Sequence, residues 1–232
     1  MSRAFKGSLI GVTVILFSTF AAGHVSVASG PAFANTTQEV TFGVGHGCEG
    51  ADTSSVRVTI PAGVTSVRAV ASDFGKATVE KDAANIVTAV TWTKAPGDIL
   101  ESDIAYYKLT LRLRVPDKPF TTLIFPARQT CTAADGGVTT VDWIAETESP
   151  DGGGPEPAPV LQILPARVRG WNKYTVPVAV SDLGDFFEDA LIVWKGSAAY
   201  SSNPNTSDLI GTTTGVTRLT ALAPNDEIWV KY

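Results

Sequence analysis

Histidine and cysteine are both scarce in this chain of 232 residues, which contains two of each. The histidines are His24 and His46, so a Ser-His-Asp or Cys-His catalytic site would have to use one of them. The sequence has neither a Gly-x-Ser-x-Gly nucleophile elbow nor a glycine-rich phosphate loop between a strand and a helix. These absences argue against the common hydrolases and nucleotide-binding enzymes, and we expect a protein without enzymatic activity.

Positive charge is also in deficit, with 18 lysines and arginines against 23 aspartates and glutamates. Residues 1–23 have the pattern of a signal peptide, with an apolar segment from Gly7 to Phe20 and small residues at Ala21 and Gly23. Its removal takes two of the 18 basic residues, which leaves 16 and a formal charge of −7. That charge argues against nucleic acid and anionic membrane surfaces as partners. No later stretch is long enough to span a membrane, so we expect a periplasmic or secreted protein.

The two cysteines, Cys48 and Cys131, lie in separate segments of the chain. In an oxidising compartment such a pair predicts one disulfide, whereas a thiolate metal site would favour a close Cys-x-x-Cys pair, which the sequence lacks. Closing a loop of this length stabilises a fold by roughly 4–5 kcal/mol in the chain-entropy model. We therefore predict a Cys48–Cys131 disulfide.

Apolar and polar residues alternate through most of the chain after residue 23, and no helical period continues for three turns. The clearest strand is Tyr107–Val115, in which the odd-numbered positions are apolar or aromatic. Further strands are expected at residues 56–60, 86–93, 121–125, 138–145 and 160–164. Turn signals rich in proline, glycine and aspartate separate them. This pattern predicts an all-β protein with an immunoglobulin-like or cupredoxin-like β-sandwich.

The character of the sequence changes after Pro165. Residues 166–232 contain three tryptophans and three tyrosines but no cysteine or histidine. Strands are expected there at residues 174–180, 190–194, 216–222 and 227–231. We predict a small second β-module that is stabilised by an aromatic core and is marginal by itself, so that it leans on the sandwich of residues 24–165.

Cleavage after Gly23 leaves His24 as the first residue of the mature protein. An N-terminal histidine can chelate one metal ion through its α-amino nitrogen and its imidazole Nδ1. The α-amino group has a pKa of about 7.7–8.0, so a divalent metal displaces its proton near neutral pH. Copper(II) is the strongest competitor for such nitrogen sites. The alternative is that cleavage falls before a histidine by chance.

Strand pairing is expected to bring the second histidine to the first. The segments 24–28 and 38–44 both have strand character, and residues 29–37 between them form a loop. In an antiparallel hairpin the start of the first strand lies beside the end of the second, so His24 falls opposite residues 42–46. The amine and the two imidazoles then form a three-nitrogen set suited to copper(II). The alternative is that His46 is a solvated turn residue beside the disulfide.

Seven short motifs, which recur in order between His24 and about Leu164, resemble the YcnI-like copper-binding family. They are His24-Val25, Gly45-His46-Gly47-Cys48, Ile60-Pro61-Ala62-Gly63-Val64, Val90-Thr91-Trp92, Phe125-Pro126 with Cys131, Asp142-Trp143 and Pro157-Ala158-Pro159. The resemblance implies an exported β-sandwich that binds copper(II) through its N-terminal histidine, with an acidic residue and a tryptophan near the metal. It also implies that the segment of residues 149–159 is a loop leading to the closing strand rather than a linker between domains.

One position departs from the pattern of the family. Many relatives place a glutamate just after the second strand, and the matching residue here is Gly47. His46 is the first candidate to replace that ligand, and Glu49 is the second. Trp143 matches the family tryptophan and is expected to cover the metal, although it also fits the sandwich core.

Three functions follow from these observations. The first is a copper(II)-binding protein that scavenges, stores or hands over copper outside the cytoplasm, with a copper-handling protein at the membrane as a partner. The second is a module that binds no metal and recognises a glycan or protein through residues 171–232, although the aromatic residues there are more often core. The third is a copper oxidase with a histidine brace, for which the sequence offers no substrate surface.

Overall fold

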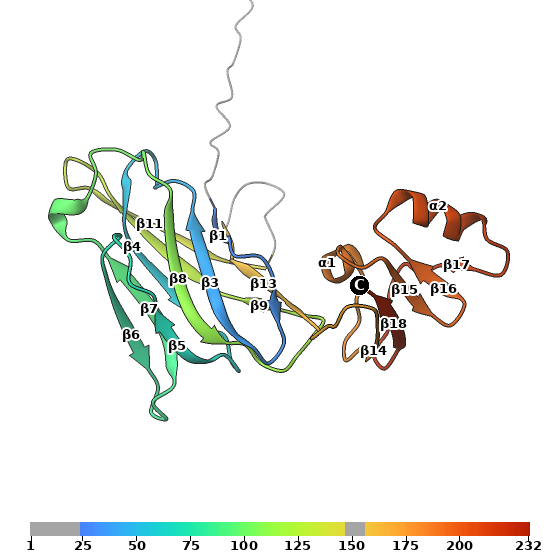
Figure 1. Cartoon of the computed structure of the whole chain (residues 1–232). Helices are drawn as coiled ribbons and strands as arrows, with labels where there is room; N and C mark the ends of the chain where they lie inside the picture. Colours follow the sequence, from blue (N-terminus) through green and yellow to red (C-terminus); the bar gives the residue numbers. More distant parts are fainter. Residues whose placement is uncertain (1–23, 147–155) are drawn as a thin grey trace, which may run out of the picture.

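The computed structural model describes residues 24–146 and 156–232, so the expected signal peptide lies outside the described residues. The described chain consists mainly of strands, which form a larger body up to Leu164 and a smaller body from Trp171 onward (Figure 1). The described residues include two short α-helices, α1 (Gly184–Phe187) and α2 (Pro204–Thr212), both in the smaller body. The predicted all-β fold with a second β-module is confirmed, whereas these helices were not expected. None of the helices in the described ranges is both long and apolar enough to cross a membrane.

The first sheet of the sandwich has four strands in the order β1-β3-β8-β5. Their bounds are β1 Val25–Val27, β3 Thr37–Val44, β8 Tyr107–Arg114 and β5 Thr65–Ala69. In β8 the side chains of Leu109, Leu111 and Leu113 are fully buried, and those of Arg112 and Arg114 are exposed. The alternation seen in the sequence therefore corresponds to one face on the core and one in water.

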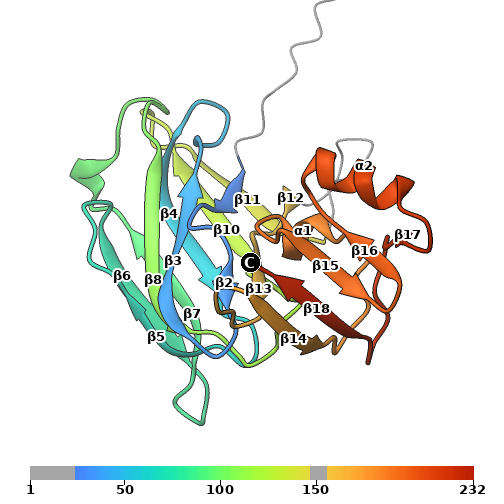
Figure 2. The same ribbon diagram turned by 45° about the vertical axis from the view of Figure 1, so that its right-hand side comes forward.

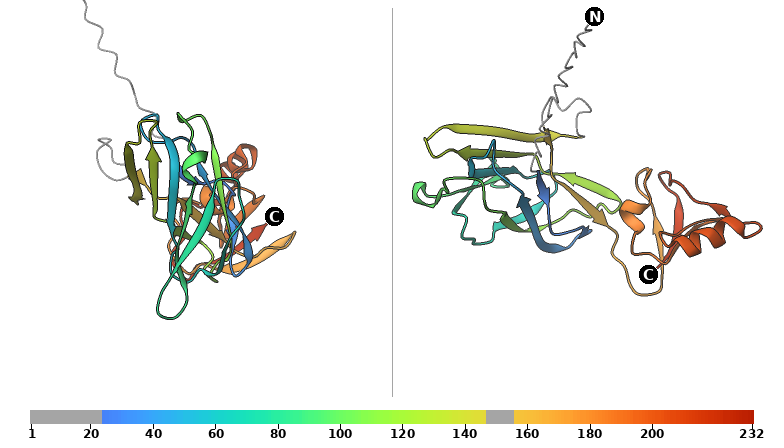
Figure 3. Two further views of the ribbon diagram at one scale, coloured as in Figure 1. Left: turned by 90° about the vertical axis from the view of Figure 1, so that its left-hand side faces the viewer. Right: turned by 90° about the horizontal axis from the view of Figure 1, so that it is seen from above.

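A second sheet of six strands, in the order β12-β11-β10-β4-β7-β6, forms the other layer. Its strands are β12 Glu156–Pro157, β11 Val138–Ala145, β10 Ala127–Thr132, β4 Asp52–Thr59, β7 Val87–Thr93 and β6 Lys76–Lys81. Three further strands, β2 Ala32–Phe33, β13 Val160–Leu164 and β9 Thr121–Ile124, form a small sheet at the side. The buried core between the layers includes Phe42, Trp92 and Phe125. Figure 3 shows the layers from two further directions.

The C-terminal module is a five-stranded sheet in the order β14-β18-β15-β16-β17, which Figure 2 shows beside the sandwich. Its strands are β14 Trp171–Thr175, β18 Glu227–Lys231, β15 Ile192–Lys195, β16 Ala198–Tyr200 and β17 Thr217–Arg218. The expected aromatic core is only partly correct. The buried cluster contains Phe186 and Phe187 but is otherwise mainly aliphatic, and the tryptophans of the module are not among its members.

The module shares its hydrophobic cluster with the sandwich through Phe120 and Leu164. The ring of Phe120 is buried against Phe186 and Phe187, with ring centroids 6.0 and 5.6 Å away. In addition, the guanidinium of Arg167 lies over the ring of Phe33, 5.2 Å from its centroid. The module therefore leans on the sandwich, as its small size led us to expect.

Candidate metal centre

The pairing of β1 with β3 positions His24, which directly precedes β1. Val25 pairs with Val44 and Val27 pairs with Phe42 in an antiparallel register. Extending this register by one residue places His24 opposite Gly45, next to His46. The predicted hairpin is therefore confirmed, and it brings both histidines to the same end of the sandwich.

Trp143 lies beside His24 at this end. The centroids of the two rings are 5.6 Å apart and their planes are inclined by 49°. The indole is 2% exposed and belongs to the sandwich core, so Trp143 both packs in the core and borders the histidine. Trp143 can therefore be a core residue and also cover the candidate metal site, because it lies at the end of the core that borders His24.

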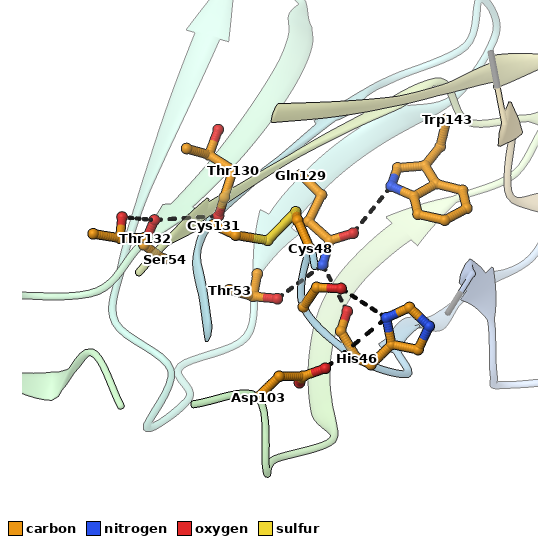
Figure 4. Close-up of a disulfide and its surroundings, with 11 residues drawn as sticks. His46, Cys48, Thr53, Ser54, Asp103, Gln129, Thr130, Cys131, Thr132 and Trp143 are labelled. Atoms are coloured by element: carbon orange, nitrogen blue, oxygen red, sulfur yellow. Dashed lines mark hydrogen bonds and ion pairs between the residues drawn. A yellow bond between two sulfur atoms is a disulfide. The ribbon is translucent and has the colours of Figure 1, made fainter. Parts of the chain in front are cut away.

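Gln129 connects Trp143 to the loop that carries His46 (Figure 4). The indole Nε1 of Trp143 donates a hydrogen bond of 3.2 Å to Gln129 Oε1. Gln129 Nε2 donates to the backbone oxygen of His46 at 2.7 Å and to the hydroxyl of Thr53 at 2.8 Å. Because Gln129 is 1% exposed, these bonds form in a largely water-free setting where they hold their partners firmly.

His46 faces an acidic residue that sequence reasoning missed. Its Nδ1 lies 2.7 Å from the backbone oxygen of Gly47 and 4.0 Å from Asp103 Oδ2. The side chains of His46 and Asp103 are 36% and 14% exposed. Asp103 comes from the loop between β7 and β8 and is fixed there by a hydrogen bond of 3.0 Å from its backbone nitrogen to Gly50 oxygen.

The predicted disulfide is present and fastens the loop of His46 to the sandwich. Cys48 and Cys131 are bonded, with their Cα atoms 5.7 Å apart (Figure 4). Cys131 lies on β10 two residues after Gln129, so both side chains point to the same face of the strand. One covalent bond and one hydrogen bond from a buried side chain therefore hold residues 46–48 in place.

Steric crowding explains why position 47, where many relatives have glutamate, is a glycine here. A Cβ atom added to Gly47 would lie 1.8 Å from the backbone oxygen of Ala51, so this loop leaves no room for a side chain. The same Cβ would lie 3.4 Å from the Cβ of Asp103. The side chain of Asp103 therefore lies next to the position that the side chain of a glutamate at residue 47 would occupy.

Glu49, the weaker predicted ligand, lies in the turn between Cys48 and Ala51 with an exposed side chain and a backbone φ of 51°. Within residues 24–146 and 156–232, no three side chains of histidine, cysteine, aspartate or glutamate are grouped closely enough to hold a metal ion. The predicted three-nitrogen set is not such a group, because one of its nitrogens is the α-amine that only cleavage before His24 creates.

A buried ion pair supports the loop of Asp103. Lys94 Nζ donates to Asp52 Oδ2 at 2.5 Å, and the hydroxyl of Tyr107 donates to Asp52 Oδ1 at 2.6 Å. The backbone nitrogen of Leu100 donates to Asp52 Oδ2 at 2.8 Å, which ties the loop to this pair. Burial raises the pKa of Asp52, but the hydrogen bonds from Lys94, Tyr107 and Leu100 outweigh it, so the pKa lies below its usual value. Burial and the bond to Asp52 raise the pKa of Tyr107.

The two-layer arrangement of strands defines an all-β sandwich with a disulfide, and the sequence of this sandwich identifies the family. Residues 24–163 match the family described as "Domain of unknown function (DUF1775)", and the chain belongs to it. A solved structure described as an uncharacterized protein from Nocardia farcinica with an immunoglobulin-like fold is 30% identical. The match covers 60% of this chain and 97% of that one, with a TM-score of 0.47. No curated protein matches the chain.

Proposed function

We propose that the mature protein binds copper(II) outside the cytoplasm through a chelate at His24. The observation that carries this proposal is the pairing of Val25 with Val44, because extending this register by one residue puts His24 opposite Gly45, next to His46. The resemblance to the YcnI-like family supports copper as the metal. Copper is the cargo of the protein rather than a cofactor of a reaction.

The α-amine and Nδ1 of His24 supply two nitrogen ligands, and an imidazole nitrogen of His46 supplies the third. Binding releases the proton of the amine, so affinity falls as the pH is lowered below the amine pKa of about 7.7–8.0. We assign the carboxylate of Asp103 as the acidic residue of the centre, because it lies 4.0 Å from His46 Nδ1 and stands beside Gly47. Glu49 is the weaker candidate for this role.

Trp143 covers the inner side of this centre. Its ring contacts that of His24, and its Nε1 is occupied by Gln129, so it presents an apolar surface to the metal. Excluding water from one side strengthens the electrostatic interactions of a bound ion. The outer side is open because His24 is exposed, which suits the transfer of copper to a copper-handling protein at the membrane.

The experiment compares the mature protein starting at His24 with a form that carries one extra glycine before it. Copper(II) titration followed by electron paramagnetic resonance reports both the affinity and the number of nitrogen ligands. Removal of a residue that supports a metal ligand typically lowers metal affinity by roughly 10–100-fold. We expect the extra glycine to lower the copper(II) affinity by more than this, because it displaces the amine from the chelate. Equal affinity and identical spectra in the two forms would overturn the proposal.

Two substitutions separate the remaining ligands. His46→Ala is expected to remove one nitrogen from the spectrum, and Asp103→Asn is expected to weaken binding while the nitrogen count is unchanged. Glu49→Gln is the matched control, since its exposed carboxylate lies in the adjacent turn. A larger loss of affinity with Glu49→Gln than with Asp103→Asn would reverse the assignment of the carboxylate.

A further inference from the structure

Three tryptophans lie together on the outward face of the C-terminal sheet, although we expected them in its core. Trp171, Trp229 and Trp194 belong to β14, β18 and β15, which are neighbours in the sheet (Figure 2). Trp229 pairs directly with Trp194, and Trp171 pairs with Lys231, two residues along β18 from Trp229. Directly paired side chains lie about 5 Å apart and diagonal ones about 7–8 Å apart, so the three indoles form one patch.

These indoles are not required for the hydrophobic core of the module. Trp171 and Trp229 are each 49% exposed, while Ile228 and Val230, their neighbours on the other face of β18, are fully buried. By contrast, Trp92 and Trp143 in the sandwich are buried. An exposed cluster of large aromatic side chains on a folded domain is typical of an interaction site.

The patch forms a shallow hollow that is open to solvent. The hollow has a volume of about 400 Å³ and is lined by Trp171, Trp194, Trp229 and Gly196. Aliphatic side chains, which commonly receive the apolar face of a docking helix, do not line it. Indoles offer a wide rigid face together with an N–H donor at the edge, so the lining suits a flat ligand with apolar faces and polar edges.

The charged residues around the hollow largely neutralise one another. On this face Lys173, which lies opposite Trp229 in the strand register, pairs with Glu227 at 2.6 Å. The ammonium of Lys231 lies over the ring of Trp171, 5.8 Å from its centroid. The rim therefore lacks the excess of positive charge that recognises phosphates, anionic lipids or nucleic acid, and it favours an uncharged ligand.

We propose that Trp171, Trp194 and Trp229 form a binding platform for an uncharged polysaccharide. The C–H face of a pyranose ring is apolar and stacks on an indole, while its hydroxyl groups reach the polar side chains of the rim. Because the three indoles come from neighbouring strands and face the same side, successive residues of a glycan chain contact successive tryptophans. The platform acts independently of copper and attaches the sandwich to a carbohydrate surface.

The test is co-sedimentation of the full mature chain with insoluble cellulose, chitin and curdlan, three uncharged polysaccharides, in the presence of EDTA so that copper plays no part. We expect binding to at least one of these, with a blue shift of tryptophan fluorescence. Trp229→Ala should weaken it about tenfold or more, as truncation of an aromatic anchor commonly does, and Trp229→Tyr should weaken it less. Leu209→Ala on α2 is the matched control, because Leu209 is an exposed apolar residue of the same module outside the hollow.

Circular dichroism of each variant ensures that a loss of binding is not a loss of folding. Binding to none of the three polysaccharides would overturn the proposal. Tryptophan-dependent binding to vesicles of phosphatidylcholine and phosphatidylglycerol, without polysaccharide binding, would assign the patch to a lipid surface instead. Tryptophan-dependent dimerisation in analytical ultracentrifugation, again without polysaccharide binding, would assign it to a second copy of the chain.

Discussion

Replacement of Gln129 by leucine tests the link between the core and the candidate metal centre. Gln129→Leu keeps a side chain of similar size but removes all three hydrogen bonds of the amide, to His46, Thr53 and Trp143. The Thr53 side chain and the Trp143 indole are almost fully buried, so water cannot replace the lost partner there.

The magnitude follows from these bonds. Each contributes about 0.5–1.5 kcal/mol net, and a buried group left without a partner costs about 1–3 kcal/mol. We therefore expect Gln129→Leu to lower the free energy of unfolding by about 3–5 kcal/mol. Because the loop of His46 and the indole of Trp143 are released together, the affinity for copper(II) should also fall, by about 10–100-fold.

Urea denaturation of the metal-free protein measures the first effect and copper titration the second. Gln162→Leu is the matched control, since Gln162 lies half-buried on β13 of the same sandwich. Trp143→Phe removes the indole donor together with part of the ring, and should couple with Gln129→Leu by about 1 kcal/mol in a double-mutant cycle. A destabilisation by Gln129→Leu no larger than that of the control would show that the network does not hold the loop.

Three further predictions concern the rest of the fold. Phe120→Ala should destabilise the C-terminal module by about 3–5 kcal/mol and separate its thermal unfolding from that of the sandwich, because it removes the ring shared by both. Asp52→Asn leaves the charge of Lys94 buried without its partner and should cost about 3–5 kcal/mol at neutral pH. The pKa of Asp52 in the folded protein lies below its usual value of 3.8. In acid-unfolding curves, the difference in free energy of unfolding between wild type and Asp52→Asn should therefore shrink only as the pH falls below 3.8. Cys48→Ser should cost about 4–5 kcal/mol in urea denaturation, and reduced wild type should behave like the variant.

The main features of the candidate centre could be predicted because they depend on strand periodicity. The alternation of apolar and polar residues indicated which residues of β3 face the core. Antiparallel pairing with β1 then predicted that His24 lies opposite the end of β3. The disulfide followed from the number of cysteines and the expected oxidising compartment. The hairpin needs only local patterns and the connection between two strands that are near in sequence.

Asp103 and Gln129 could not be predicted, because their roles come from contacts between segments far apart in the chain. Asp103 lies in an irregular loop whose path is set by the buried carboxylate of Asp52, and no spacing rule relates it to His46. Gln129 is a polar residue at an inward position of β10, which the alternation would assign to an apolar side chain. An inward-facing glutamine beside a cysteine of the disulfide was the one signal in the sequence that could have found it.

The tryptophans of the module show a different limit. Period-two alternation identifies the two faces of a strand but not which face is buried. The aromatic composition led us to expect Trp171 and Trp229 on the buried face, whereas they lie on the exposed one. Phe120 from the sandwich and Phe186 and Phe187 around α1 fill the buried side instead. This contribution from outside the module is invisible to a reading of residues 166–232 alone.

The disulfide that fastens the His46 loop also imposes an order of events on the proposed copper site. On the proposed export route, Cys48 and Cys131 stay thiols in the reducing cytosol, so the loop is not yet tied to β10 there. A chain still carrying the expected signal peptide also has no free amine at His24. The proposal therefore implies that both parts of the site form only after export, and that a newly made chain does not withdraw copper from the cytosol.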